Sequence, residues 1–285
     1  MVKTEETKKK EIKIKQNSIL GVLNRVWTGF VNNYIMEAGR VMIFFMDSVR
    51  WWVTPPYRFG EIVTHMEFVG NQSLIIIFLT GGFTGLVFAF QAWIGLRIVN
   101  ADNLVGPVTG MAIARELGPV LTGLIISARA GGAMAARLGT MRVSEQIDAL
   151  EVMGVDAKNY LVAPRILAAL IATPLLCAFF DFVAFLGAYL LAVYLVKLDP
   201  AVFIAKTKFF VDPKDINEGL FKASVFGAFF AAICTYKGFN TKGGAKGVGD
   251  ATNHGVVASM VTIIILDYFL TKIVSMVDGL KSIKM

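Results

Sequence analysis

The sequence predicts an all-helical integral membrane protein, with an interfacial amphipathic helix near the N-terminus followed by five transmembrane helices. Hydrophobic residues make up 55% of the 285 positions, charged residues only 17%, and the mean hydropathy is +0.62. This composition excludes a disordered chain and disfavours a soluble globular domain. Between Glu67 and Arg97 lie 29 residues without a charge. As a helix they would extend about 43 Å, more than the roughly 30 Å hydrocarbon layer of a bilayer.

The N-terminal region divides into a tail and a helix. Residues 1–17 mix lysines with glutamates and lack the apolar run of a signal peptide, so they predict a charged cytoplasmic tail. Residues 18–59 place apolar side chains at helical spacing, with arginines, asparagines and Asp47 on the polar side. This stripe, with its tryptophans, favours a helix in the membrane interface over one packed on a soluble core. Pro55 and Pro56 are expected to end it.

Five segments are apolar enough to span a membrane, and they are expected at 68–97, 104–136, 160–196, 219–237 and 254–277. The fourth has only 14 residues between Lys222 and Lys237. These two side chains are therefore expected to extend toward the lipid headgroups. The connection after the third span contains two prolines and mixed charges. It predicts a short surface helix, with Asp199 or Asp212 available as N-caps.

Basic residues in the connections predict the orientation. With a cytoplasmic N-terminal tail, the cytoplasmic side collects 18 lysines and arginines, and the opposite side collects nine. Cytoplasmic connections are enriched in basic residues, so the N-terminus is expected inside and the C-terminus outside.

The connection between the second and third spans, 143–154, predicts a short acidic helix. Its acids fall every third residue on one side and its apolar residues share another side. The acids are Glu145, Asp148 and Glu151, and the apolar residues are Ile147, Leu150 and Met153. Ser144 is expected to cap the helix, and Gly154 to end it in a left-handed conformation. The acids disfavour contact with an anionic leaflet and favour docking on a basic partner surface.

Enzymatic and metal-binding motifs are missing from the sequence. It has no H-E-x-x-H, G-x-S-x-G or paired C-x-x-C motif, and its two histidines, His65 and His254, are far apart. Cys177 and Cys234 lie in apolar segments, where neither a disulfide nor a metal ligand is expected. The glycine-rich stretch 241–250 lacks the Walker order and is interpreted as a flexible basic turn, with contact to a partner or anionic lipid as the alternative. No catalytic residue, metal or cofactor is assigned to this chain.

Small residues recur every four positions in the first two predicted spans, which creates flat surfaces where helix backbones can approach closely. They are Gly81, Gly85 and Ala89 in the first span, and Gly123, Ser127, Gly131, Ala135 and Gly139 in the second. This spacing predicts tight helix packing, either within one chain or between two copies.

Arg115 and Glu116 are charged residues inside the second predicted span. A charge there is costly unless it is paired or faces water. Because adjacent residues point about 100° apart on a helix, the two need different surroundings. Either they line a pathway for lipid or ions, or they form ion pairs with residues of another helix. Asp181 and Asp267 are the candidate partners. The aromatic residues of the first span either pack and face lipid or line a cavity for acyl chains.

Two long stretches carry a resemblance to a known family. The segment ARELGPVLTGLIISARAGGAMAARLGTMRVSEQIDALEVMGVD at 114–156 looks like the signature region of MlaE-type permeases, also called the YrbE family. The segment TYKGFNTKGGAKGVGDATNHGVVASMVTIIILDYFLT at 235–271 resembles their C-terminal part. The likeness extends from about Gly60 to the last span and is weak in the tail and the interfacial helix. The chain is thus similar to membrane subunits of ABC transporters that work with MCE-domain proteins.

The resemblance implies a homodimer in the bacterial inner membrane, with cytoplasmic ATPases that bind ATP and Mg²⁺, an MCE-protein ring outside and, in some members, a STAS-domain subunit. It implies lipid, commonly phospholipid, as the substrate, and no nucleic acid. The family's coupling helix matches Ser144, Glu145, Gln146, Ile147, Asp148, Ala149, Leu150, Glu151, Met153 and Gly154. The lipid pathway is expected near Arg115, Glu116, Leu86, Phe90 and Trp93.

Two other functions fit the same features. A membrane scaffold would recruit an ATPase without carrying lipid. An autonomous ion or solute transporter would use Arg115, Glu116 and Asp181 along an ion path. The acidic helix and the missing nucleotide motif favour the ATPase-driven permease over the autonomous transporter.

Overall fold

The structure is a computed structural model that describes residues 35–50 and 58–282, with side chains described as far as residue 276. Every regular element in these ranges is a helix. Five helical stretches in these ranges are long and apolar enough to cross a membrane. The predicted all-helical membrane fold is therefore confirmed.

The chain divides into two units, Met1–Asp47 and Ser48–Met285, and each is described by itself. Helix α2 (Met36–Arg50) belongs mostly to the first unit and shows that this part of the expected interfacial helix 18–59 is helical. The tail 1–17, residues 18–34 and the expected end at Pro55 and Pro56 lie outside the described residues. Placement of α2 in the membrane interface stays a prediction.

The first two candidate spans are longer than predicted and consist of several helical pieces. The first joins α3 (Phe59–Gly70), η2 (Asn71–Ser73) and α4 (Leu74–Arg97). The second joins η3 (Asp102–Leu104), α5 (Val105–Ala112), η4 (Ile113–Leu117), α6 (Gly118–Ile126), η5 (Ser127–Gly131) and α7 (Gly132–Val143). Both η4 and η5 are π-helical turns, and π turns often lie at functional positions.

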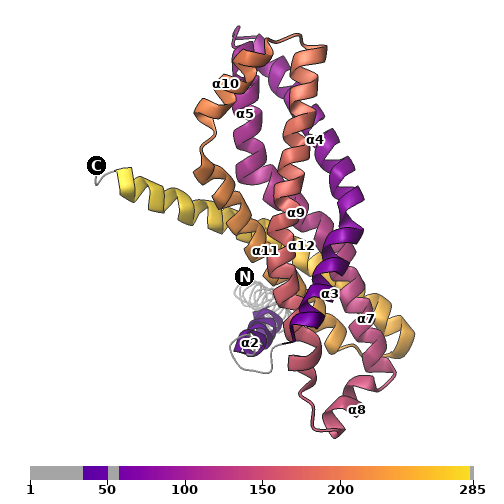
Figure 1. Cartoon of the computed structure of the whole chain (residues 1–285). Helices are drawn as coiled ribbons and strands as arrows, with labels where there is room; N and C mark the ends of the chain where they lie inside the picture. Colours follow the sequence, from indigo (N-terminus) through magenta and orange to yellow (C-terminus); the bar gives the residue numbers. More distant parts are fainter. Residues whose placement is uncertain (1–34, 51–57, 283–285) are drawn as a thin grey trace, which may run out of the picture. The chain divides into compact units, whose positions relative to one another are not determined.

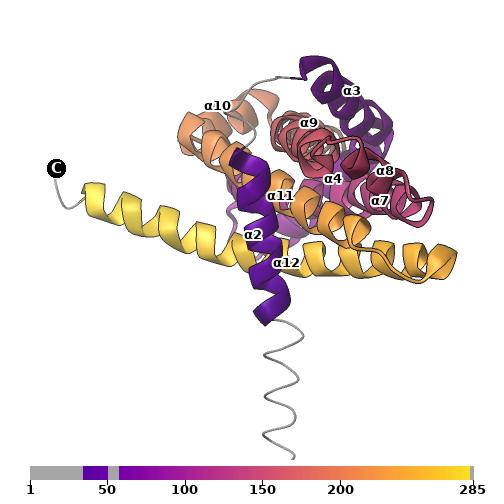
Figure 2. The ribbon, with the colours of Figure 1, turned by 90° about the horizontal axis from the view of Figure 1, so that it is seen from below.

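The last three candidate spans follow the predicted order. They are η6 (Lys158–Val162) with α9 (Ala163–Leu190) and η7 (Leu191–Leu195), then α11 (Pro213–Phe239), then α12 (Gly244–Ser282). In the second unit, α4, α9, α11 and the pieces of the second span lie side by side (Figure 1). Helix α12 lies along α11 and α7 (Figure 2) and is the least buried of the five spans.

Two short helices connect the spans. Helix α8 (Gln146–Val152) follows α7 and lies past its lower end in Figure 1. Helix α10 (Pro200–Phe210) follows the third span, as predicted, and the Asp199 carboxylate caps it by accepting from the backbone N–H of Ala201 at 2.7 Å. Asp212 is the N-cap residue of α11, and its own N–H donates to Asp215 Oδ2 at 3.1 Å.

The small residues of the first two spans pack against other helices of the same chain. A Cβ on Gly85 would lie 1.8 Å from the Ala184 carbonyl oxygen of α9. A Cβ on Gly131 would lie 2.8 Å from Cys234 Sγ of α11. Glycine is required at such points because the backbones or side chains already touch. The tight packing predicted from the spacing is therefore packing within the chain at these positions.

The glycine-rich stretch 241–250 is mostly helical and forms a shorter turn than expected. Gly243 and Gly244 have φ values of 93° and 68°, in the left-handed region that glycine adopts without strain. They reverse the chain after α11, and α12 continues from Gly244. The prediction of a flexible turn was wrong for most of this stretch. The glycines after Gly244 lie in α12, which packs on neighbouring helices.

Candidate functional site

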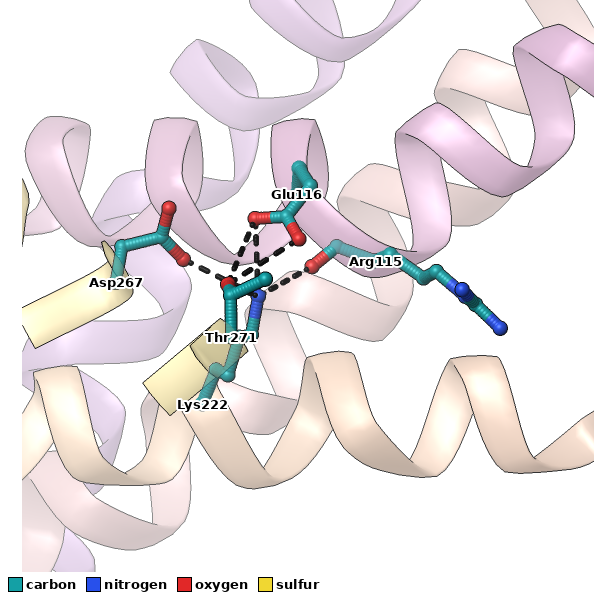
Figure 3. A network of polar contacts seen from close by, with 5 residues as sticks. All are labelled: Arg115, Glu116, Lys222, Asp267 and Thr271. Carbon is teal, nitrogen blue, oxygen red and sulfur yellow. Dashed lines mark hydrogen bonds and ion pairs between the residues drawn. The ribbon is translucent and has the colours of Figure 1, made fainter. Parts of the chain in front are cut away.

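A buried lysine joins the second, fourth and fifth spans. The Lys222 side chain of α11 is only 3% exposed. Its Nζ donates to Glu116 Oε2 at 2.9 Å, Asp267 Oδ1 at 3.3 Å, Thr271 Oγ1 at 2.7 Å and the Arg115 carbonyl oxygen at 3.0 Å. Figure 3 shows these groups surrounding the ammonium. We call Glu116, Lys222, Asp267 and Thr271 the central cluster.

Lys222 does not extend toward the headgroups, so that prediction was wrong. It lies nine residues after the start of α11, about 14 Å along the helix. A buried ammonium is tolerated only where ionic and hydrogen-bonding partners replace water. Two carboxylates supply that replacement, so the side chain turns inward.

Arg115 and Glu116 contact different helices, as their adjacent positions require. Arg115 donates through Nε and Nη2 to Asp215 Oδ1, at 2.9 and 2.5 Å, and the Asp215 side chain is 3% exposed. Asp267 reaches this region through Lys222, as the ion-pair hypothesis allowed. The side chains of Arg115 and Glu116 still remain 49% and 42% exposed. They are paired within the chain and also accessible from outside it.

The backbone geometry of η4 explains how the fourth span reaches this pair. A Cβ on Gly219 would lie 2.1 Å from the Ala114 carbonyl oxygen, so α11 packs directly on the π turn. Lys222 follows Gly219 by three residues and therefore faces the same turn. π turns leave backbone carbonyls available to other partners, and the Arg115 carbonyl accepts from Lys222.

Asp181 is not a partner of the central cluster. It lies on α9 against α6, where a Cβ on Gly118 would meet its Oδ1 at 1.8 Å. Cys177 Sγ is 3.8 Å from Asp181 Oδ2, and Oδ1 has no hydrogen-bond partner among the described residues. The prediction that Asp181 could pair with Arg115 or Glu116 was wrong, because its side chain is directed at Gly118 and Cys177 instead.

The apolar residues expected along the lipid pathway lie at the end of α4. Leu86 and Trp93 pack on a buried cluster formed by Ala89, Val105, Ala188 and Leu191. Phe90 is 47% exposed, and its ring centroid is 5.9 Å from that of Trp93. Arg97 lies over the Trp93 ring, 5.1 Å from its centroid. This group has its neighbours on α5 and α9, whereas Arg115 and Glu116 have theirs on α11 and α12.

An acidic helix forms within 143–154 as α8 (Gln146–Val152), shorter than predicted, and its capping differs from the prediction. Ser144 does not cap α8, because its hydroxyl donates to the Thr140 carbonyl of α7 at 2.8 Å. The N-cap residue is Glu145, with a left-handed φ of 58°. Gly154 has a φ of 78°, as predicted for the C-terminal end.

The apolar side chains of the 143–154 segment fall into a buried group and an exposed group. Ile147 is fully buried within the chain, whereas Val152 and Met153 are 89% and 68% exposed. Asp148 forms an ion pair with Arg142 at 2.5 Å, while Glu145 and Glu151 are exposed. The surface that α8 presents therefore combines two exposed acids with an apolar end. We call Glu145, Glu151, Val152 and Met153 the α8 surface.

Sequence reasoning missed Lys222, Asp215 and Thr271 as members of this polar region. A signal was present in their spacing. Asp215 and Lys222 are seven residues apart, and Asp267 and Thr271 are four apart, which places each pair on one face of its helix. Polar or charged residues that share a face of an apolar helix indicate a polar interior rather than two separate ends.

An all-helical chain with five candidate spans, a polar cluster within them and a short acidic helix outside defines a multi-pass membrane transport subunit. A family model described as Permease MlaE matches residues 62–273. The chain belongs to the MlaE permease family and is an ABC transporter permease of that family.

Similar proteins come from bacteria and a plant. A probable ABC transporter permease protein of Rickettsia bellii is 37% identical over 82% of this chain and 91% of the relative. The intermembrane phospholipid transport system permease protein MlaE of Haemophilus influenzae is 33% identical over 76% and 83%. The chloroplastic protein TRIGALACTOSYLDIACYLGLYCEROL 1 of Arabidopsis thaliana is 34% identical over 86% and 68%.

Proposed function

We propose that this chain is the permease subunit that moves lipid, most simply phospholipid, between the inner membrane and an MCE-protein complex. It works as a homodimer, with its N-terminus cytoplasmic, and a separate ATPase binds ATP and Mg²⁺ and drives it through 143–154. The name of the Haemophilus influenzae relative, an intermembrane phospholipid transport permease, supports the substrate class. The observation that carries the coupling is the exposed α8 surface.

The α8 surface has the composition expected of a docking site. Val152 and Met153 would be hydrated apolar groups in the isolated chain, and burying them against a partner is favourable. Glu145 and Glu151 beside them select a partner with basic residues at the rim of its groove. Ile147 anchors α8 to the rest of the chain, so a force on α8 is transmitted to α7.

Copurification with the ATPase tests the coupling. Replacing Glu145, Asp148 and Glu151 by lysine reverses the charge of α8 and should abolish ATPase binding while membrane insertion stays intact. Because Asp148 also pairs with Arg142, the double variant Glu145→Lys/Glu151→Lys is the cleaner test. Lys208→Glu on α10 is a matched charge-reversal control far from α8. Undiminished copurification of the double variant would refute the coupling.

The lipid pathway is supported by the half-exposed side chains within the second span. A phospholipid needs polar groups for its headgroup and apolar walls for its acyl chains. Arg115 and Glu116 offer the first, and Phe90 with the neighbouring Leu86 and Trp93 offers the second. The two groups have different neighbours within one chain, so a second copy would complete the cavity between them.

Lipid crosslinking and mass spectrometry test the pathway and the partners together. Glu116→Ala should reduce photocrosslinking to a phospholipid probe, whereas Glu151→Ala on α8 should not. Full labelling of Glu116→Ala would count against the pathway. Mild detergent purification followed by mass spectrometry of bound proteins and lipids would report the ATPase, the MCE protein and any STAS-domain subunit. Recovery of the ATPase without any lipid in the complex would favour a scaffold.

A further inference from the structure

Two arginines lie over one phenylalanine ring at the α8 end of the second unit, and a third arginine and a histidine interact with their charge. The guanidinium carbons of Arg129 and Arg137 lie 4.9 and 4.1 Å from the centre of the Phe68 ring. Arg165, near the start of α9, and His65, on α3, are close enough to Arg137 to interact with its charge. We call Arg129, Arg137, Arg165 and His65 the basic cluster.

The basic cluster lacks carboxylate partners. In the part of the chain that the structure describes, no acidic side chain forms an ion pair with Arg129, Arg137 or Arg165. Glu61 acts on Arg165 only through a longer-range charge interaction. Neutral groups hold the arginines instead. Arg129 donates to the Phe68 carbonyl oxygen at 2.8 Å. Arg165 donates to the Leu161 carbonyl oxygen of η6 at 2.5 Å. Within the described residues, no ion pair therefore compensates their positive charges.

The cluster is reached from outside through Arg137. Arg165 is buried, Arg129 is half-buried, and Arg137 is exposed. A guanidinium has five N–H donors in a planar fork that matches the oxygens of a phosphate group. An anion placed at Arg137 would relieve the repulsion among like charges and accept several charge-assisted hydrogen bonds.

The surroundings of the cluster favour a lipid over a water-soluble anion. Arg137 lies six residues before the end of α7, about 9 Å along the helix, so it is near the boundary of the candidate span. The first span exposes large apolar side chains on both sides of Phe68 along the sequence, with Val63 62% exposed on α3 and Ile75 74% exposed on α4. Acyl chains can pack on these side chains while a headgroup reaches the arginines.

We propose that the basic cluster binds the phosphate of an anionic lipid headgroup in the leaflet at the α8 end, with the acyl chains along α3 and α4. This lipid is a bound component of the protein and is distinct from the cargo proposed near Arg115 and Glu116. The site lies on α3, η5, α7 and α9, whereas the central cluster lies on η4, α11 and α12. The proposal depends on membrane insertion and holds whether or not the chain moves lipid.

Native mass spectrometry of the full-length protein, titrated with phosphatidylglycerol, phosphatidylcholine or diacylglycerol, tests the site. The wild-type protein should retain phosphatidylglycerol at least tenfold better than phosphatidylcholine and should not retain diacylglycerol. Arg137→Gln should lower phosphatidylglycerol retention about tenfold, the loss expected for charge-assisted hydrogen bonds. Arg137→Lys should keep part of it, because charge remains but the planar fork is lost.

Lys208→Gln is the control, because Lys208 is an exposed cation on α10, outside both the basic cluster and the proposed lipid pathway. It should retain phosphatidylglycerol as the wild-type protein does. Equal retention of phosphatidylglycerol and phosphatidylcholine by the wild-type protein would overturn the proposal without any variant. So would unchanged retention by Arg137→Gln. Displacement of the lipid by millimolar inorganic phosphate would assign the site to a free anion and overturn the lipid assignment.

Discussion

Replacing Lys222 by methionine tests whether the central cluster is an ion-pair centre of the fold. The substitution keeps an unbranched side chain of similar length and removes the cation that forms ion pairs with both Glu116 and Asp267. Breaking a buried ion pair by removing one partner costs about 3–5 kcal/mol, because the other charge is left desolvated. Glu116 and Asp267 are 42% and 21% exposed, so water can replace part of the lost interaction. We therefore expect a loss of about 3 kcal/mol, at the lower end of that range.

Reversible unfolding in mixed detergent micelles, followed by circular dichroism, measures this loss. Lys208→Met on α10 is the control, because Lys208 is an exposed lysine outside the spans. It should change the free energy of unfolding by less than about 0.5 kcal/mol. Adding Glu116→Gln and Asp267→Asn to Lys222→Met should restore at least half of the loss, since neutral amides need no cation.

Two results would refute this reasoning. Lys222→Met could prove no more destabilising than Lys208→Met. The triple variant could also be less stable than Lys222→Met alone. Either result would mean that the carboxylates do not depend on the buried ammonium.

Further variants test packing, α8 and the buried thiols. Gly85→Ala should lower the free energy of unfolding by about 1–3 kcal/mol through overpacking. Gly95→Ala should be neutral or stabilising, because a Cβ there would meet nothing within 4 Å. Equal unfolding curves for the two variants would contradict the close helix contact at Gly85. Ile147→Ala should cost about 2–4 kcal/mol and speed hydrogen exchange in α8. Val152→Ala should leave stability unchanged and weaken ATPase copurification. A Val152→Ala variant that is destabilised but copurifies normally would contradict the assignment of Val152 to the docking surface. Buried Cys177 should resist maleimide until the chain unfolds; rapid labelling of the folded protein would show that its helix contacts open.

The number and order of the spans could be predicted because hydropathy over about 20 residues depends little on tertiary contacts. The cap at Asp199 was predictable for a similar reason, since a carboxylate before proline at a helix start acts on the backbone next to it. The left-handed end at Gly154 is equally local. These features depend on a few neighbouring residues, and the sequence contains them directly.

The polar contacts could not be predicted, because each depends on which helices pack together and on how each helix is rotated about its axis. Lys222 near a helix end is compatible with the headgroups or with the interior, and only the partners on η4 and α12 select the interior. Ser144 is adjacent to both α7 and α8, and its hydroxyl donates to the Thr140 carbonyl oxygen of α7 rather than capping α8. Asp181 carries a charge suitable for Arg115, yet the rotation of α9 turns it toward Gly118.

The π turns η4 and η5 confine a change in the length of the second span to the turn where it occurs. Each π turn holds one residue more than an α-helical turn does and absorbs that residue locally. Deleting one residue from η4 would restore regular α-helical winding, and the helix beyond it would keep its faces. Gly123 and Gly131 would still face α11, whereas Arg115, inside the turn, would lose its register with Asp215. A relative with one residue fewer at this point can therefore keep its helix contacts and lose only the contacts of the turn itself.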